Sequence, residues 1–191
     1  MNIIPQSIPD VLLVEPKVLG DDRGYFMETF RQDFFLKATG YPVVFIQDNE
    51  SRSTKGVLRG LHYQLAPAAQ SKLVRVIQGE VFDVAVDIRK GSPTYGKYVG
   101  VVLSGENKKQ LFIPRGFAHG FVVLSDEAIF SYKVDNYYSP ENDCGIAFDD
   151  PDINIDWQLP LEHLKLSHKD MCQPKLENLT KVFEFGKNYY E

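Results

Sequence analysis

One histidine, His62, stands in the stretch VLRGLHYQ, which otherwise has the pattern of a buried strand. An imidazole in this setting can bind a metal, act as a base near neutral pH, or be satisfied by one hydrogen bond inside a core. Unpaired charges among apolar strands are costly, so polar neighbours of His62 either line a wet cavity or pair with one another. The polar side chains that share this setting are Arg59, Lys72, His119 and Tyr132.

Two other segments carry polar residues suited to binding. In VVFIQDN, alternation places Gln47 and Asn49 on the same face as Phe45, where their amides could bind hydroxyl or carbonyl groups. The segment DDRGYFMETF is too apolar for an ordinary loop and too charged for a core. Its spacing leaves open that Arg23 and Glu28 form only a surface ion pair.

Alternation of apolar and polar residues, interrupted by glycine-rich turns, predicts an all-β chain. Many short antiparallel strands best fit a double-sheet jelly roll. One helix is predicted near residues 31–39, ended by Gly40 with Phe34 and Phe35 facing inward, and a second helical piece near 160–164. Strands are predicted at residues 11–18, 43–49, 73–78, 79–89, 97–104, 109–114, 120–125 and 128–134. Within residues 79–89, Phe82, Val84, Val86 and Ile88 share one face, and Asp83, Ala85, Asp87 and Arg89 share the other.

The length of 191 residues predicts a single domain, residues 1–175, followed by a tail, residues 176–191, that carries no motif. A formal charge of −5 argues against a general nucleic-acid or membrane-surface binder, which would need a basic field. We expect a cytoplasmic protein, because the amino terminus lacks the pattern of a signal peptide and no apolar run approaches about 20 residues. Cys144 and Cys172 are expected to be free thiols.

Six stretches, taken in order, carry a resemblance to one family. They are DDRGYFMETF, FIQDNES, VLRGLHYQ, KLVRVIQGEVFDVAVDIRKGSPTYGKYVGV, FIPRGFAHGF and YKVDNYYSPENDCGI. Over about residues 8–174 the chain resembles the dTDP-4-dehydrorhamnose 3,5-epimerase family, cupin-fold enzymes that act on sugar nucleotides. The resemblance implies a double-stranded β-helix, the cupin jelly roll, with a few short helices and with neither a metal nor another cofactor.

A metal site is the competing interpretation of the histidines. The run PRGFAHGF, which contains His119, matches the second half of a metal-binding cupin motif. The first half fails, since Gln64 stands where the second histidine of a His-x-His pair would be, and glutamine is a poor ligand for a transition metal. The sequence therefore predicts no metal.

By resemblance, His62 is the base that removes a proton next to the 4-keto group of the sugar, a task that suits the pKa of an imidazole. Asp170, in LSHKD, is implied to orient that ring, with Asp83 as the second choice. Tyr132 resembles the proton donor on the opposite face, and Lys72 the group that stabilises the enolate. Taken alone, each of the last two residues is more often structural.

The resemblance also implies a set of substrate-binding residues. Arg23 and Arg59 correspond to contacts with the diphosphate, and Tyr138 to an aromatic ring that stacks on thymine. The family often has glutamate at the position of Asp143, so this shorter side chain has less reach. The remaining implied contacts are Phe26, Glu28, Gln47, Asp48, Asn49, Lys72, His119 and Lys169.

The predicted function is epimerisation of dTDP-4-dehydro-6-deoxy-D-glucose at C3 and C5, giving dTDP-4-dehydro-L-rhamnose for dTDP-L-rhamnose synthesis. Within the family, an epimerase acting at one carbon is the alternative. From other classes, a non-catalytic sugar-nucleotide-binding cupin and a metal-dependent cupin oxygenase remain open. The resemblance further implies a homodimer with strand exchange, in which Arg23 and Glu28 could serve the partner's cleft.

Overall fold

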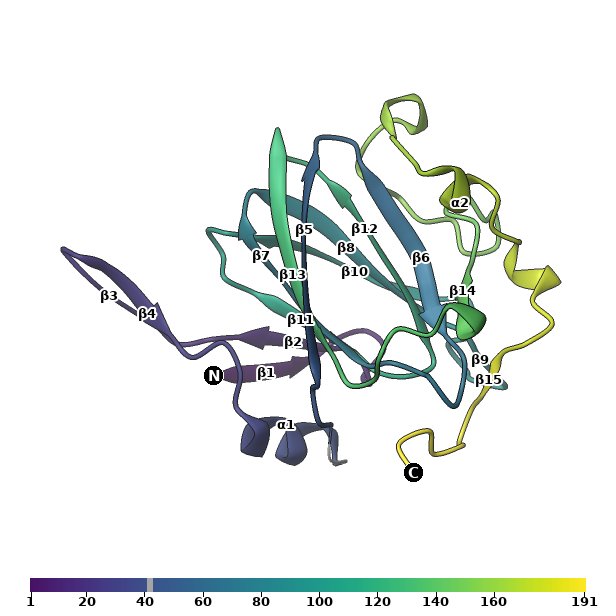
Figure 1. Cartoon of the computed structure of the whole chain (residues 1–191), viewed down its shortest axis with the longest axis horizontal. Helices are drawn as coiled ribbons and strands as arrows, with labels where there is room; N and C mark the ends of the chain where they lie inside the picture. The colour runs from purple at the N-terminus through teal and green to yellow at the C-terminus, as the bar shows by residue number, and fades with distance from the viewer. Residues whose placement is uncertain (41–42) are drawn as a thin grey trace.

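The computed structural model describes residues 1–40 and 43–191, whose main strands form two facing sheets (Figure 1). The first sheet has six strands in the order β1-β2-β11-β7-β13-β5, and the second has five in the order β10-β8-β12-β6-β14. Every strand pairing within these two sheets is antiparallel. The predicted all-β jelly roll with a few short helices is confirmed.

The strands and helices have the following bounds. The six-stranded sheet contains β1 (Asn2–Pro5), β2 (Leu12–Glu15), β5 (Gln47–Thr54), β7 (Lys72–Gln78), β11 (Gln110–Ile113) and β13 (Glu127–Val134). The five-stranded sheet contains β6 (Leu58–Gln64), β8 (Glu80–Asp87), β10 (Tyr98–Ser104), β12 (Phe117–Val123) and β14 (Asp143–Gly145). Two small pairs join β3 (Val18–Asp21) to β4 (Gly24–Met27) and β9 (Arg89–Lys90) to β15 (Phe183–Glu184). The helices are α1 (Gln32–Thr39), α2 (His168–Met171) and the 3-10 turns Pro140–Asn142, Leu161–His163 and Leu176–Asn178.

Strand β8 has two apolar faces, each of which packs in a different buried cluster. Val81 and Ala85 belong to the apolar cluster between the sheets, whereas Phe82, Val84 and Val86 belong to a second cluster. That second cluster contains Leu58 and Leu61 of β6 together with segments that follow β14, so it lies on the other face of the five-stranded sheet (Figure 1). The predicted two-faced alternation of this strand is confirmed, and both of its faces are buried.

Helix α1 and a third cluster cover the outer side of the six-stranded sheet. Phe35 is buried there, and its ring lies 5.6 Å from that of Phe112. The helix ends where Gly40 takes a φ of 76° and donates its N–H to the carbonyl of Leu36, as predicted. The prediction that Phe34 also faces inward is only partly met, because Phe34 is half-buried beneath the guanidinium of Arg31. Of the helices in residues 1–40 and 43–191, none is long and apolar enough to cross a membrane.

Three strand predictions are wrong at their ends by three or more residues. The strand predicted over 120–125 is β12, which begins at Phe117 and ends at Val123. The segment predicted as one strand over 11–18 is β2 followed by β3, because Pro16 has no N–H to continue the ladder. The strand predicted over 43–49 begins at Gln47 and continues through the polar residues 50–54. Both β1 and the hairpin formed by β3 and β4, which projects from the body in Figure 1, carry no strand prediction for most of their length.

A bulge in β6 decides which of its side chains face inward. His62 pairs with His119 of β12, whereas Arg59 pairs with Phe121, so three steps along β6 match two along β12. The extra residue is Gly60, which has a φ of 119°, and a Cβ there would lie 2.6 Å from the backbone of β12. The bulge therefore needs glycine and brings both Arg59 and His62 to the inner face of the sheet.

Candidate active site

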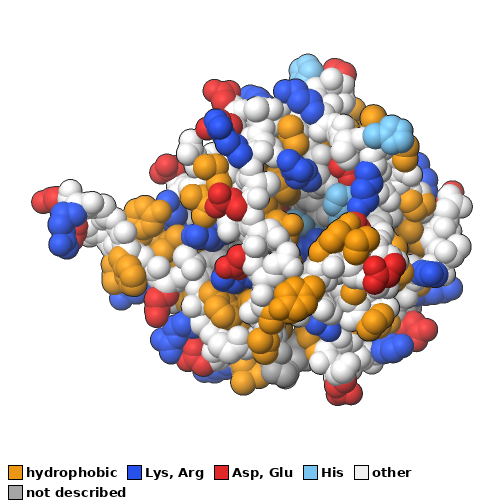
Figure 2. All heavy atoms as spheres, in the orientation of Figure 1, with side chains coloured by type: hydrophobic (Ala, Val, Ile, Leu, Met, Phe, Trp, Pro, Cys, Tyr) orange, Lys and Arg blue, Asp and Glu red, His pale blue; other side chains and the backbone are white. Residues whose placement is uncertain are grey.

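The inner faces of the sheets leave an open hollow at one end of the jelly roll. It divides into two adjoining cavities of about 350 and 280 Å³, and His62, Lys72 and Tyr132 line both. Figure 2 shows histidine atoms deep in a hollow of this face, with Lys and Arg side chains around it. This size suits a small organic ligand, and the lining is unusually rich in ionisable groups.

His62 and Asp170 form a close hydrogen-bonded pair in the hollow. Nε2 of His62 lies 2.5 Å from Oδ1 of Asp170, on α2. Ser167 caps this helix, since its hydroxyl donates to Oδ2 of Asp170 at 2.7 Å and accepts the N–H of Asp170 at 3.1 Å. Burial alone would raise the pKa of Asp170, but the hydrogen bonds from His62 and Ser167 outweigh burial and lower it. Asp170 is therefore an anion that holds Nε2–H, which leaves Nδ1 of His62 to accept a proton.

A second histidine and carboxylate pair lies deeper between the sheets. Nε2 of His119 lies 3.0 Å from Oδ2 of Asp83, and both side chains are buried. Burial lowers the pKa of His119 despite the nearby Asp83 carboxylate, so the ring is neutral at pH 7. Asp83 therefore contacts His119 and not His62. Among the described residues, no group of three or more His, Cys, Asp or Glu side chains is arranged to hold a metal ion.

Lys72, at the start of β7, brings a cation to the floor of both cavities. Its ammonium lies 3.4 Å from the carbonyl oxygen of His62. Burial lowers the pKa of Lys72 to about 8, although Asp83 and Asp143 oppose this shift. The ammonium is thus mainly charged at pH 7 and poorly solvated, which makes it a strong partner for negative charge that develops on a ligand.

Tyr132 and Arg59 complete the reactive side of the hollow. Burial raises the pKa of Tyr132, with Arg59 opposing the shift, so the phenol keeps its proton and is a donor. The guanidinium of Arg59 is exposed and donates from Nε to the hydroxyl of Ser53 at 3.2 Å. Its remaining N–H groups form a planar fork that suits an anionic group.

The opposite wall of the larger cavity carries polar and aromatic side chains. Gln47 donates from Nε2 to Oδ1 of Asn49 at 2.8 Å. The hydroxyl of Tyr138 donates to Oδ2 of Asp143 at 2.9 Å, and Lys169 forms an ion pair with the same carboxylate. The exposed ring of Tyr138 is thereby held at the mouth of the cavity.

The hollow does not contain every residue that the sequence proposed. Asp48 points to the outer face of β5, where it pairs with Lys133 at 2.8 Å. Arg23 and Phe26 lie on the projecting hairpin, and Glu28 follows it; all three are exposed and do not line the cavities of their own chain. The alternation of β5 could have identified Asp48, but the position of the hairpin depends on tertiary structure.

Several lining residues were not proposed from the sequence. Ser167 could have been found, because the pattern Ser-x-x-Asp, which runs from Ser167 to Asp170, is typical of a helix start. The others give no local signal, since polar residues look the same whether they face solvent or a ligand, and buried aromatic residues look the same whether they pack in a core or border a cavity. These residues are Glu50, Ser51, Tyr63, Gln64, Gln70, Phe121 and Phe130.

Comparisons with known proteins agree on one family. A family model described as dTDP-4-dehydrorhamnose 3,5-epimerase matches residues 5–178. The dTDP-4-dehydrorhamnose 3,5-epimerase of Shigella flexneri is 64% identical over 171 residues, which is 90% of this chain and 93% of that protein. The crystal structure of a Legionella pneumophila dTDP-6-deoxy-D-glucose-3,5-epimerase in complex with dTDP-4-keto-L-rhamnose has a TM-score of 0.92 at 51% identity, covering 97% of this chain and 99% of that one. A dTDP-4-dehydrorhamnose 3-epimerase from Streptomyces niveus is 38% identical over 82% of this chain and 76% of its own length.

Proposed function

The chain belongs to the dTDP-4-dehydrorhamnose 3,5-epimerase family, and on that basis we propose how its hollow epimerises dTDP-4-dehydro-6-deoxy-D-glucose at C3 and C5. The product is dTDP-4-dehydro-L-rhamnose. The observation that carries the proposal is the His62–Asp170 pair in a hollow shared with Lys72 and Tyr132. These four residues supply a base, its orienting anion, a cation and an acid.

The chemistry needs proton transfer on two faces of the sugar ring. The 4-keto group acidifies the C–H bonds at C3 and C5, and Nδ1 of His62 removes a proton from one face. Asp170 stabilises the imidazolium that forms, because it already holds the other ring nitrogen. Lys72 stabilises the negative charge that develops on the C4 oxygen, and Tyr132 returns a proton to carbon from the opposite face.

We assign the nucleotide to groups from both cavities, Arg59 from the smaller one and Tyr138 from the larger one. Arg59 offers its guanidinium to the diphosphate, while Tyr138 stacks on the thymine base. His119, Gln47 and Asn49 then offer hydrogen bonds to the sugar or nucleotide. The remaining proposed contacts are Asp143 and Lys169.

A second copy of the chain explains the exposed hairpin. Its apolar side chains are unusually open to solvent, with Phe26 66% and Tyr25 58% exposed. We propose that the hairpin enters the cleft of a partner in a homodimer, where Arg23 and Glu28 contact the substrate. Mixing an Arg23→Ala chain with a His62→Ala chain tests this, since a shared site restores about a quarter of the wild-type activity in exchanged dimers. Failure to complement, with a monomeric mass of 21.8 kDa, would contradict it.

The number of carbons that react separates the proposal from its nearest alternative. The 3-epimerase relative from Streptomyces niveus makes a single-carbon reaction the second candidate. In deuterated water, the proposed enzyme incorporates solvent deuterium at both C3 and C5 of the sugar. Label at one carbon alone would contradict the proposal and favour the alternative.

The substitution His62→Ala tests whether the imidazole is needed for turnover and not for binding of dTDP. We expect His62→Ala to abolish turnover and deuterium incorporation while the affinity for dTDP changes by less than about threefold, because the imidazole contacts the sugar and not the nucleotide. A non-catalytic binding protein predicts no turnover in the wild type either. We also propose a cytoplasmic location, supported by the two free cysteines.

A further inference from the structure

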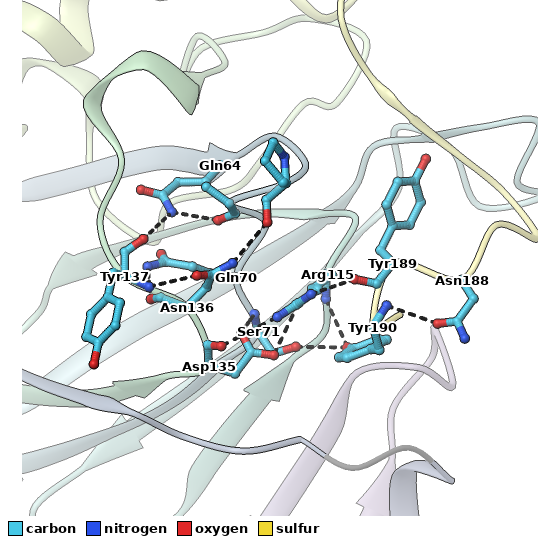
Figure 3. Close-up of polar contacts among 12 residues, drawn as sticks. Gln64, Gln70, Ser71, Arg115, Asp135, Asn136, Tyr137, Asn188, Tyr189 and Tyr190 are labelled. Carbon is cyan, nitrogen blue, oxygen red and sulfur yellow. Dashed lines mark hydrogen bonds and ion pairs between the residues drawn. The ribbon is translucent and has the colours of Figure 1, made fainter.

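The carboxy-terminal tail packs against the back of the active-site wall. Phe183 is buried and β15 pairs with β9, so the tail is fixed to the body before its last residues. These contacts lie beyond residue 178, where the match to the family model ends. Tyr190 then reaches Ser71, directly before the start of β7, close to Asp135, which directly follows the end of β13 (Figure 3).

Tyr190 and Arg115 join the tail to the body. The Tyr190 hydroxyl accepts the backbone N–H of Arg115 at 3.2 Å and shares a hydrogen bond with the hydroxyl of Ser71 at 2.8 Å. Arg115 in turn donates from Nη1 to the carbonyl of Tyr189 at 2.5 Å, and its guanidinium lies over the Tyr190 ring. Ser71 is fully buried, so the hydroxyl it shares with the tail is out of reach of solvent.

The buried carboxylate of Asp135 connects Arg115 to the chain segments that border the hollow. Asp135 accepts from Nε of Arg115 at 3.2 Å and from the backbone N–H of Ser71 at 2.6 Å. Its side chain is 2% exposed. Ser71 directly precedes Lys72, and Asp135 directly follows the end of β13, so this carboxylate ties together the two chain segments that border the hollow.

Beyond Asp135 the two segments are bound to each other residue by residue. Gln70 donates to the carbonyl of Asn136 at 2.7 Å, and Gln64 donates to the carbonyl of Tyr137 at 3.1 Å. Gln64 also accepts the backbone N–H of Ser139 at 2.8 Å. Residues 136–139 therefore have their backbone fixed on both sides of Tyr138, the ring at the mouth of the cavity.

We infer that the tail is a positioning element for nucleotide binding, in which Tyr190 and Arg115 act through Ser71 and Asp135 on the wall that carries Tyr138. Neither Tyr190 nor Arg115 lines the two cavities, so both act on substrate through other residues. The hydrogen-bonded chain leads to the base-stacking side of the hollow, whereas the His62–Asp170 pair is held separately by α2. Loosening the tail should weaken binding of the nucleotide more than it slows the chemical step. This inference rests on the proposed function, because it assumes that Tyr138 contacts the nucleotide.

The test removes one hydroxyl and keeps the ring. Tyr190→Phe deletes the hydroxyl hydrogen bonds to the backbone N–H of Arg115 and to Ser71 but keeps the ring beneath the Arg115 guanidinium. The matched control Tyr189→Phe deletes a hydroxyl hydrogen bond to the backbone N–H of Glu184 inside the tail. We expect Tyr190→Phe to raise KM and the Kd for dTDP by about two- to tenfold, which is the change in affinity expected from losing one net hydrogen bond. The value of kcat should stay within twofold of the wild type. Ser71→Ala should give a similar change, and adding it to Tyr190→Phe should cost little more.

Calorimetric titration with dTDP measures the affinity of the wild type, Tyr190→Phe and Tyr189→Phe. Wild-type affinity in Tyr190→Phe, or equal losses in Tyr190→Phe and Tyr189→Phe, would overturn the inference. So would a fall in kcat that matches a fall in Tm while KM stays constant, since this is what a purely structural role predicts. If the wild-type chain does not bind dTDP, the proposed function fails and the inference with it; normal binding and turnover with no effect of Tyr190→Phe removes the inference alone.

Discussion

Lys72 should give the enzyme an alkaline limit to its activity. In the proposed mechanism the ammonium acts only while protonated, because its positive charge is what would stabilise the enolate oxygen. Its pKa of about 8 means that the charge is lost as the pH rises through this value. From pH 7 to pH 9 the protonated fraction of Lys72 falls from about 90% to about 10%, so kcat/KM should fall roughly ninefold. In a plot of log(kcat/KM) against pH, this alkaline limb should reach a slope of −1.

Two substitutions of Lys72 distinguish this charge from other titrating groups. Lys72→Met should lower kcat about 10²- to 10³-fold, as expected for removing one electrostatic partner of the transition state, and should eliminate the limb near pH 8. Lys72→Arg keeps a charge that a guanidinium does not lose in the usable pH range, so the fall in kcat/KM near pH 8 should disappear while part of the activity remains.

The assay is kcat/KM against pH, because this ratio reports ionisations of the free enzyme. Lys133→Met is the matched control, since Lys133 carries the same charge on the adjoining strand but pairs with Asp48 on the outer face. The control should keep both the rate and the limb of the wild type. A limb near pH 8 that persists in Lys72→Met, or a wild-type profile that is flat to pH 9, would refute the role of this ammonium.

Three further substitutions test the parts that hold the base. Asp170→Asn should lower kcat by about 10²- to 10⁴-fold with dTDP affinity within twofold, because the amide cannot stabilise the imidazolium of His62; a loss under tenfold would contradict the pairing. Ser167→Ala should lower the free energy of unfolding by about 1–2 kcal/mol and slow kcat several-fold, and Ser167→Thr, which keeps the hydroxyl, should restore both. Gly60→Ala should cost about 1–3 kcal/mol more in urea unfolding than Gly91→Ala, because both have positive φ but only Gly60 faces backbone at 2.6 Å. Equal costs would show that close approach in the bulge does not matter.

The local sequence pattern was enough to predict strands in which residues of different types alternate between the two faces. Residues 79–89 alternate between large aliphatic residues and small or acidic ones, and β8 follows that alternation with one face toward each core. Polar strands lack this signal. Most of β5 reads as loop, because its inner residues face a wet cavity and its outer residues face solvent.

The site was predicted mainly where a residue breaks an apolar pattern. His62 and Lys72 are conspicuous because a strand has little reason to hold them, and the structure brings both to one hollow. The pairing of His62 with Asp170 could be proposed only by resemblance, since the two residues are 108 positions apart. The hairpin that carries Arg23 shows the limit, because it does not line the cavities of its own chain and no local pattern says which surface it contacts.

Polar groups at and behind the hollow replace apolar side chains at inner positions of the jelly roll. On β12 His119 stands between the buried Phe117 and Phe121, and on β8 Asp83 stands between Val81 and Ala85. A lone substitution of this kind would leave an unpaired polar group in the core, at a cost of several kcal/mol. The substitutions are instead matched across strands, so that His119 meets Asp83 and no buried side-chain nitrogen or oxygen in residues 1–40 and 43–191 is without a partner. Pairing across strands therefore lets the core hold polar groups beside the cavities without leaving any of them unsatisfied.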